Sequence, residues 1–372
     1  MMRTISTIEV ALLARELGAL EGFRLEQFYQ SGRGTFRFKF ASRERTSNLL
    51  CILPLTMHET TYLVKQEEAS NFAMAVRNRI AGMQVTKVSQ YNDDRIIMFK
   101  LEGKGKETNL IIELFGKGNM VLTESDMTID LAYVERDFRT RRIRKGEAYI
   151  PPENPGIGIS NISSARTALG AGLKEAGPKQ NIAAFVSRSA NIGTLYVEDA
   201  IIKAGVDPRS PAALVEPNAL GEICRNMELA VAAIDGPKVR AYMDGDVPVD
   251  YAIIDIAKYS AMETRKFGSM QEALDALYHH MLEREDREGS ERVRELESSL
   301  EKQRRLMKED EEAKEREREI GRKIYENMDV INSISMALQQ NRRMTLKELE
   351  DIFPEAKVTS LDLKEKSFTI EV

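Results

Sequence analysis

The sequence has few of the residues that bind metals or form disulfide bonds. It contains two cysteines, Cys51 and Cys224, and three histidines, His58, His279 and His280. The cysteines lie far apart in the chain, and no cysteine or histidine has the spacing of a metal-ligand motif. We therefore expect no disulfide bond, no zinc site and no other cofactor.

Long apolar segments are absent as well. No stretch reaches the roughly eighteen consecutive apolar residues of a membrane-spanning helix. Near the N-terminus, Glu9 and Arg15 interrupt the apolar residues before they form the core of a signal peptide. These features predict a cytoplasmic protein without a membrane partner.

No set of residues forms a catalytic pattern. There is no Ser-His-Asp set in a suitable context and no Cys-His pair, and His279 and His280 fall in a predicted helix where solvated side chains are expected. Gly116 and Gly118 predict a hairpin turn, because no serine or threonine of a phosphate-binding loop follows the lysine between them. We predict no catalytic residue and no metal ligand, and a binding protein rather than an enzyme.

Charge is distributed unevenly along the chain. The net charge is −5, but residues 283–319 alone hold 15 acidic and 11 basic side chains, so the rest is nearly neutral. Cations cluster in residues 135–145, ERDFRTRRIRK. Such a cluster can follow a phosphate backbone, although a solvated loop is an equally good interpretation. Its cations are Arg136, Arg139, Arg141, Arg142, Arg144 and Lys145.

Hydrophobic periodicity predicts one mixed domain in the first 150 residues. Residues 6–20 are typical of an amphipathic helix, with Ser6 or the following threonine as the cap and Glu9 completing a capping box. Residues 24–64 predict a β-meander, and residues 70–82 predict a second helix. Four strand-like segments follow. The expected fold class is α+β with a largely antiparallel sheet.

The middle of the chain changes character twice. Prolines in residues 149–156 mark a first boundary. Residues 160–235 are alanine-rich and predict short helices, in which Ile192–Thr194 could form the turn of a helix-hairpin-helix. The signal is weak because the turn contains only Gly193. Residues 238–268 return to a β pattern.

A long charged helix is predicted after residue 268, followed by a short helix and a strand. Its apolar residues share one heptad register, but the same register is polar in the middle, at Asp310, Lys314 and Glu317. The helix therefore needs an antiparallel neighbour or is solvated, and a homodimer through it is a further expectation. The apolar residues are Leu296, Leu300, Met307, Ile324, Met328 and Ile331.

The acidic turn before residue 96 contains a further candidate pair, Asp94 and Arg95. In one interpretation Asp94 belongs to an ordinary turn and Arg95 covers a sheet edge. In the other, Asp94 holds the guanidinium of Arg95 in place for a phosphate or a base edge. Spacing alone favours the first interpretation and cannot separate the two.

The predicted helix of residues 70–82 carries two more candidate cations. Its pattern places Phe72 and Met74 on the buried face and Arg77 and Arg79 elsewhere. A surface role for these two arginines is therefore expected.

Four phrases, in order and in register, resemble the NFACT proteins, the RqcH family of ribosome quality-control factors, in an archaeal form. They are SNFAMAVRNRIAG (70–82), DRIIMFKLEG (94–103), NLIIELFGKGNMVLTESD (109–126) and RRIRKGEAYIPPE (141–153). The resemblance covers the chain from end to end. It implies residues 1–153 as an NFACT-N domain, 154–236 as a helix-hairpin-helix domain, 237–270 as a β segment completing the N-terminal region, 271–340 as a long coiled-coil helix and 341–372 as a short helix and strand.

The resemblance also implies a function. Proteins of this family bind large ribosomal subunits that carry peptidyl-tRNA on a stalled chain, and they recruit aminoacylated tRNA to extend the chain without a template. In bacterial members the added tail is alanine. The Asp-Arg pair that the family associates with tRNA engagement corresponds to Asp94 and Arg95, which favours their functional interpretation. With Arg77, Arg79 and the cations of residues 135–145, they are the expected tRNA-binding residues.

Two departures and two alternatives accompany the resemblance. The family start usually has aspartate where this chain has Glu9, and the second coiled-coil helix and NFACT-R domain are expected to be missing after Val372. The NFACT-N domain is similar in fold to formamidopyrimidine-type DNA glycosylases, so DNA binding or glycosylase activity is one alternative. That chemistry uses an N-terminal proline amine, and Met2 and Arg3 stand there instead. A fibronectin-binding adhesin is the other alternative.

Overall fold

The computed structural model describes residues 3–61, 70–154, 156–173, 177 and 180–371. Contacts divide the chain into two compact units, Met1–Arg284 and Glu285–Val372. The fold is α+β, which confirms the predicted class. The finer division into five domains stays a prediction.

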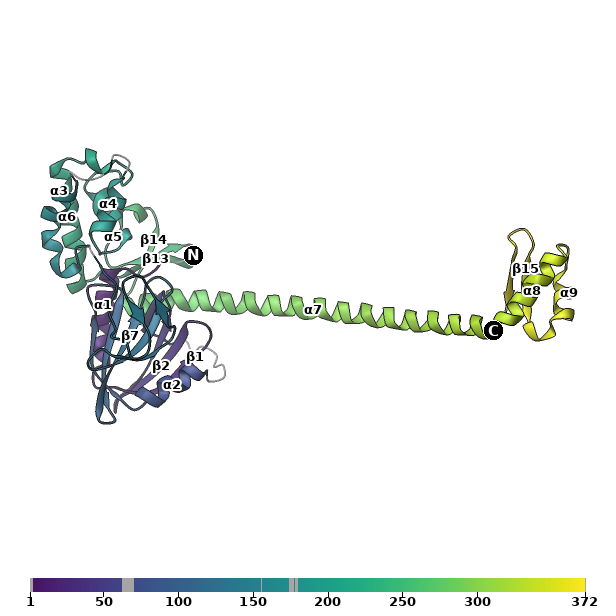
Figure 1. Cartoon of the computed structure of the whole chain (residues 1–372). Coiled ribbons are helices and arrows are strands. Elements are labelled where there is room, and N and C mark those ends of the chain that lie inside the picture. Colours follow the sequence, from purple (N-terminus) through teal and green to yellow (C-terminus); the bar gives the residue numbers. More distant parts are fainter. Residues whose placement is uncertain (1–2, 62–69, 155, 174–176, 178–179, 372) are drawn as a thin grey trace. The chain divides into compact units, whose positions relative to one another are not determined.

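The first unit is built on one antiparallel sheet of nine strands, in the order β4-β3-β2-β1-β5-β6-β7-β8-β9. Neighbouring strands are consecutive in the chain except at the junction of β1 and β5, between which β2, β3, β4 and α2 lie in the sequence; Figure 1 labels several of these elements. The strands are β1 (Arg24–Gln30), β2 (Thr35–Ala41), β3 (Thr46–Ile52), β4 (Thr56–Glu59), β5 (Gln84–Gln90), β6 (Ile96–Gly103), β7 (Lys106–Glu113), β8 (Asn119–Glu124) and β9 (Ile129–Ala132).

The segment after β9 packs against β2 in an aromatic core. Tyr133, just after β9, lies edge-on to Phe36 of β2 at 4.9 Å, and its hydroxyl accepts a hydrogen bond from the Gly34 amide at 3.1 Å. Strand residues therefore face a closed interior in which aromatic rings pack against one another. The fully buried rings are Phe28, Phe36, Phe38, Phe40 and Phe99.

Helix α2 (Asn71–Ile80) packs against β1 of the sheet. Phe72 packs against Tyr133 at 5.0 Å, as the pattern predicts. Met74 is 44% exposed, so its predicted place in the core is wrong. The buried face is formed instead by Ala73 and Val76 with Ile80, which lie on one side of the helix.

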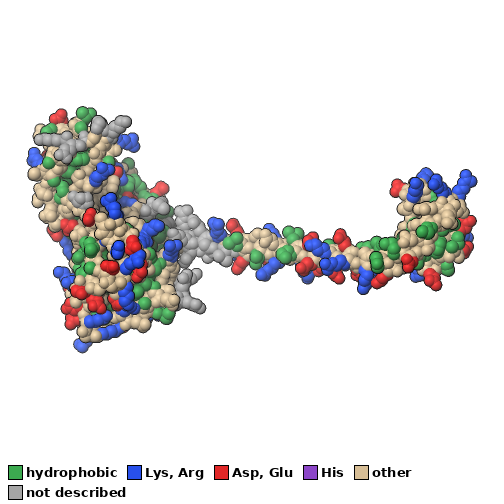
Figure 2. All heavy atoms as spheres, viewed as in Figure 1, with side chains coloured by type: hydrophobic (Ala, Val, Ile, Leu, Met, Phe, Trp, Pro, Cys, Tyr) green, Lys and Arg blue, Asp and Glu red, His purple; other side chains and the backbone are tan. Residues whose placement is uncertain are grey.

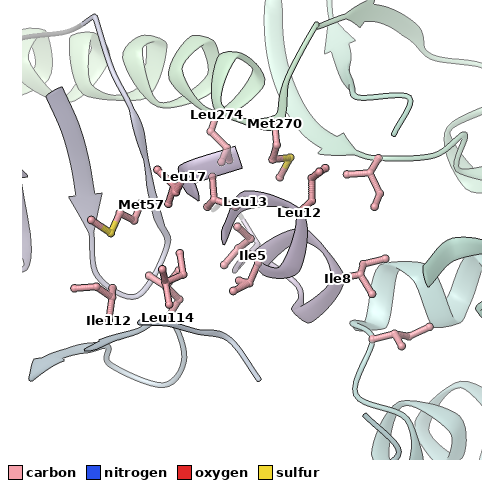
Figure 3. Packing of buried hydrophobic residues seen from close by; sticks show 14 of the residues in the cluster. Ile5, Ile8, Leu12, Leu13, Leu17, Met57, Ile112, Leu114, Met270 and Leu274 are labelled. Carbon is pink, nitrogen blue, oxygen red and sulfur yellow. The ribbon is translucent and has the colours of Figure 1, made fainter. Parts of the chain in front are cut away.

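Helix α1 (Thr7–Leu17) contacts the nine-stranded sheet, the end of the helical segment and the start of α7. Ser6 caps it and Glu9 completes the capping box, as predicted. Figure 3 shows its apolar residues between Met57 and Ile112 of the sheet and Met270 at the start of α7. Full burial of each such side chain contributes about 1.5–3 kcal/mol, so this short helix holds several elements together.

A helical segment follows the sheet and contains the predicted helix-hairpin-helix. Helices α4 (Ile182–Ser189) and α5 (Thr194–Lys203) are joined by a tight turn that ends at Gly193, with a φ of 106°. The turn packs directly on the start of α1. The segment is completed by η2 (Ile159–Ser164), α3 (Ala165–Leu173), η3 (Ala212–Leu214), α6 (Pro217–Ala232) and η4 (Ala233–Asp235).

A three-stranded antiparallel sheet and the start of α7 complete the first unit. Its strands, in the order β13-β12-β14, share the main core through residues such as Tyr251 and Ile253. They are β12 (Arg240–Asp244), β13 (Val247–Ala252) and β14 (Glu263–Lys266), with η5 (Ala257–Tyr259) between the last two.

Helix α7 (Met270–Glu326) begins buried and then becomes exposed. Met270 and Leu274 lie in the main core, whereas Leu296 is 63% exposed. Figure 2 shows acidic, basic and apolar side chains interspersed along it. The predicted single helix of residues 271–340 is wrong in one respect, because α7 ends at Glu326 and α8 (Met328–Gln340) begins after a break at Asn327.

The second unit has a small core of its own. Ile334 of α8, Leu349 of α9 (Leu346–Ile352) and Val358 at the start of β15 are buried together. Strands β15 (Val358–Asp362) and β16 (Ser367–Ile370) form a hairpin after η6 (Pro354–Ala356). Among the described residues, no helix is both long and apolar enough to cross a membrane.

The close approach of the hairpin turn to α1 generates a prediction. A Cβ atom on Gly193 would lie 2.4 Å from the Cβ of Ser6, whereas one on Gly205 would meet nothing within 4 Å. Both glycines have positive φ, at 106° and 74°, so both alanine variants carry a backbone penalty. Thermal unfolding should show a melting temperature several degrees lower for Gly193→Ala than for Gly205→Ala. Equal losses would contradict tight packing of this turn on α1.

Candidate nucleic-acid interface

The turn that precedes β6 connects the nine-stranded sheet to the helical segment. Asn92 and Asp93 both adopt positive φ, at 59° and 45°, which suits the short polar side chains of this turn. The Asp93 carboxylate accepts a hydrogen bond from the Ser160 amide at 3.1 Å and another from its hydroxyl. The Asn191 side chain donates to the Asp93 carbonyl at 2.8 Å. The turn is therefore fixed from both sides, and Arg95 follows it.

Asp94 and Arg95 do not form the ion pair that the sequence hypothesis requires. The Asp94 carboxylate accepts a hydrogen bond from the backbone amide of Arg95 at 2.7 Å. The Arg95 guanidinium instead donates to the Thr4 hydroxyl at 3.3 Å. Burial lowers the pKa of Arg95, and the nearby charge of Asp94 opposes this effect. Asp94 thus stabilises the turn, and the functional roles of both residues stay a prediction.

Arg95 belongs to a row of alternating guanidinium groups and aromatic rings. Its guanidinium carbon lies 6.0 Å from the ring centre of Phe115. The Arg141 guanidinium lies 5.7 Å from the same ring and 4.8 Å from that of Phe138. We call these four residues the cation–aromatic ladder. Because contacts of this type are worth about 0.5–2 kcal/mol, the ladder can fix Arg95 and Phe138 relative to each other.

Arg141 is held firmly within the ladder. Its guanidinium donates to the Glu113 carboxylate at 2.6 Å and to the Ile150 carbonyl at 3.2 Å. The Tyr149 hydroxyl donates to the same carboxylate at 3.0 Å. Arg141 is only 6% exposed, so its predicted place on an exposed cationic surface is wrong. Its charge is used inside the protein, where it supports the two rings.

The hairpin that carries Phe138 also presents exposed cations. Strands β10 (Arg136–Asp137) and β11 (Arg142–Ile143) pair, and the Phe138 amide donates to the Arg141 carbonyl at 2.8 Å across the turn. Arg139 and Arg142 are exposed and form no ion pair with any residue that the structure describes. Arg136 is half-buried and also has no ion-pair partner among those residues.

The remaining predicted cations are paired with protein groups. Arg144 forms an exposed ion pair with Asp137, in which its Nε donates at 2.8 Å. Arg79 and Lys145 share the Asp130 carboxylate, at 2.8 and 3.7 Å. Burial raises the pKa of Asp130, but the hydrogen bond and charge of Arg79 and the charge of Lys145 outweigh it and lower that pKa.

Arg77 on α2 also has a partner in the protein. It donates to the Phe28 carbonyl at 2.7 Å, and its guanidinium lies 5.2 Å from the Tyr29 ring. The structure therefore brings Arg95 and Arg141 to the ladder, and it places Arg136, Arg139 and Arg142 on the hairpin of β10 and β11. It does not bring Arg77 there.

Sequence reasoning missed a buried polar network at the start of α1. The Arg3 guanidinium donates to both oxygens of Glu9, at 2.8 and 2.6 Å, and to Asp250 at 2.8 Å. The Tyr196 hydroxyl donates to Glu9 at 2.7 Å. Burial lowers the pKa of Arg3, but the charges of Glu9, Tyr251 and Asp250 and the hydrogen bond to Glu9 together raise that pKa well above its usual value. The network joins α1, α5 and β13, and the capping box was its only visible sign in the sequence.

The described residues include no metal-binding cluster of histidine, cysteine, aspartate or glutamate. Cys51 and Cys224 are buried and free, and burial lowers the pKa of His58 to about 4. An open cleft of about 530 Å³ lies beside the start of α7. It is lined by carboxylates, Arg265 and His279, without an arrangement that suits nucleophilic catalysis.

Two arginines of the hairpin region provide a matched test of this geometry. Arg141 and its partner Glu113 are both 4% exposed in their side chains, whereas the Arg144–Asp137 pair is 55% and 48% exposed. Removing one partner of a buried pair leaves an uncompensated charge and costs about 3–5 kcal/mol. Chemical denaturation should show a large loss of stability for Arg141→Gln and little change for Arg144→Gln. Similar small effects would contradict the supporting role of Arg141.

Comparison of the sequence with known proteins identifies relatives of this chain. The sequence matches the NFACT N-terminal and middle domains over residues 6–370. It is 24% identical over 279 residues to the Archaeal Rqc2 homolog aRqcH of Methanocaldococcus jannaschii, covering 73% of this chain and 41% of that protein. It is 29% identical over 131 residues to the human ribosome quality control complex subunit NEMF, covering 35% of this chain and 12% of that protein. The chain thus spans less than half the length of these relatives.

A solved structure supports the same fold. The fibrinogen binding protein from Staphylococcus aureus matches with a TM-score of 0.58 and 19% identity, over 73% of this chain and 98% of that one. At this identity the likeness shows the fold alone.

Proposed function

The chain belongs to the NFACT family, and from this premise we propose that it is a tRNA- and ribosome-binding factor of ribosome-associated quality control. Its substrates are large ribosomal subunits that carry peptidyl-tRNA on a stalled chain. It recruits aminoacylated tRNA to them, and the stalled chain is extended without a template, with alanine as the expected residue. The relatives named for ribosome quality control support this proposal.

One observation carries the tRNA-binding part of the proposal. The cation–aromatic ladder connects Arg95 to a hairpin on which Arg139 and Arg142 are exposed and without an ion-pair partner among the described residues. A cation whose charge is not neutralised by a carboxylate can release counterions from a phosphate backbone when it binds. Arg95 has unused donors for the same purpose, because the structure gives its guanidinium one hydrogen bond, to Thr4.

A binding function, without catalysis by this chain, fits the start of α1. Glycosylases of the similar fold use a proline amine as nucleophile, and Met2 and Arg3 are not prolines. The Arg3 side chain is committed to Glu9 and Asp250. The likeness to a fibrinogen-binding protein concerns the fold, and no feature of the described surface favours adhesion.

The remaining parts of the proposal concern location and partners. A factor that acts on ribosomes in this way is expected in the cytoplasm. Apolar side chains of α7 that are at least half exposed include Leu296 at 63%, Leu300 at 50% and Met307 at 65%. Pairing with a second helix, as a homodimer would provide, covers such residues.

The proposal predicts tRNA binding that weakens steeply with salt. Fluorescence anisotropy of labelled tRNA, measured with the full chain over a KCl series, should give a linear fall of log K with log[KCl]. Arg139→Gln and Arg142→Gln should each reduce the slope by about one. Arg95→Ala should weaken binding by about tenfold, since hydrogen bonds to charged groups contribute about 1.5–3 kcal/mol.

Arg43→Gln is the matched control. Arg43 is exposed in the turn after β2. Strand pairing aligns Ala41 of β2, through Arg24 and Gln84, with Glu102 near the end of β6. Arg95 precedes the start of β6, so the two arginines lie at opposite ends of the sheet. This variant should keep the slope and the affinity of the unchanged chain. Absent binding, or binding that does not respond to salt, would contradict the proposal.

A further inference from the structure

An aromatic ring stands exposed among the cations of the candidate interface. Phe138 is 43% exposed, although it is one of the large apolar side chains that proteins usually bury. It lies in the turn between β10 and β11, next to Arg139. Exposed aromatic rings that are flanked by cations are typical of surfaces that bind single-stranded nucleic acid.

The Phe138 ring is supported from inside the protein. The Arg141 guanidinium lies 4.8 Å from the ring centre and is fixed by Glu113 and the Ile150 carbonyl. A phenylalanine has only two side-chain torsions, so little conformational entropy remains to be lost when a ligand packs on it. The exposed part of the ring is thus a preformed contact surface.

The neighbouring charges restrict the ligand. Arg139 and Arg142 are exposed on the same hairpin and attract phosphate groups, whereas the ring accepts a flat apolar surface. A paired duplex offers phosphate groups but no accessible flat base surface, because its bases are stacked on each other and its deep groove is narrow. An unpaired nucleotide offers both.

We propose that Phe138 stacks on an unpaired base of the bound RNA while Arg139 and Arg142 contact its backbone. This inference rests on the proposed tRNA-binding function and specifies which part of the RNA the hairpin recognises. Stacking makes the hairpin selective for loops and single-stranded ends over helices, without selecting a particular base.

The absence of tryptophan from this chain allows a direct test. The sequence contains no Trp, so Phe138→Trp introduces a single fluorescent reporter at the proposed contact. The probes are an RNA hairpin with an open loop and a fully paired RNA of the same length. The hairpin should quench the fluorescence of this variant as it binds, and the duplex should not. Leu214→Trp, at a residue that is 75% exposed on the helical segment, should respond to neither RNA.

Binding measurements with the same probes complete the test. Phe138→Ala should weaken hairpin binding by about tenfold and leave its salt slope and the duplex affinity unchanged, because one stacking contact is lost and no charge is removed. Phe138→Tyr should restore binding, and Phe138→Leu should not. Each of these results supports the inference.

Three results would overturn it in different ways. If tRNA binds with a steep salt dependence but the Phe138→Trp fluorescence does not change with any RNA, the stacking inference fails and the proposed function stands. If neither tRNA nor the RNA hairpin binds at all, both fail together. Equal quenching by hairpin and duplex would also refute selectivity for unpaired bases.

Discussion

The ion pair between Arg3 and Glu9 is the constraint on which the first unit depends. Glu9 receives two hydrogen bonds from Arg3, one from Tyr196 of α5 and one from the Ser6 amide at the helix cap. The pair therefore fixes the segment before α1 against both the helical segment and the three-stranded sheet. Thr4 lies within that segment, and its hydroxyl accepts a hydrogen bond from the Arg95 guanidinium.

Two ion pairs, each with a buried carboxylate, thus stand at the two ends of one chain of contacts. Arg3–Glu9 fixes the segment that meets Arg95, and Arg141–Glu113 fixes the guanidinium between Phe115 and Phe138. Buried ion pairs contribute little net stability, because desolvation offsets their attraction. Their consequence here is positional, since each holds a guanidinium in one orientation and so determines what the surface can contact.

The sequence predicts the elements better than it predicts the partners of charged side chains. Local patterns are sufficient for the capped helix α1, the antiparallel sheet and the turn at Gly193, because each depends on neighbouring residues. The burial of Arg141 depends on Glu113, which is 28 residues away on another strand. Six cations in one window therefore look equivalent although their environments differ. The sequence shows Phe138 among these cations, but only the fold shows that its ring is exposed.

The most direct test of the account is to map where bound tRNA touches the chain. Ultraviolet crosslinking of the full chain to tRNA, followed by mass spectrometry of the crosslinked peptides, reports contacts without any substitution. Crosslinks are expected in the hairpin of residues 136–143 and in the turn of residues 91–95. Crosslinks confined to other surfaces, such as the three-stranded sheet or α9, would contradict it.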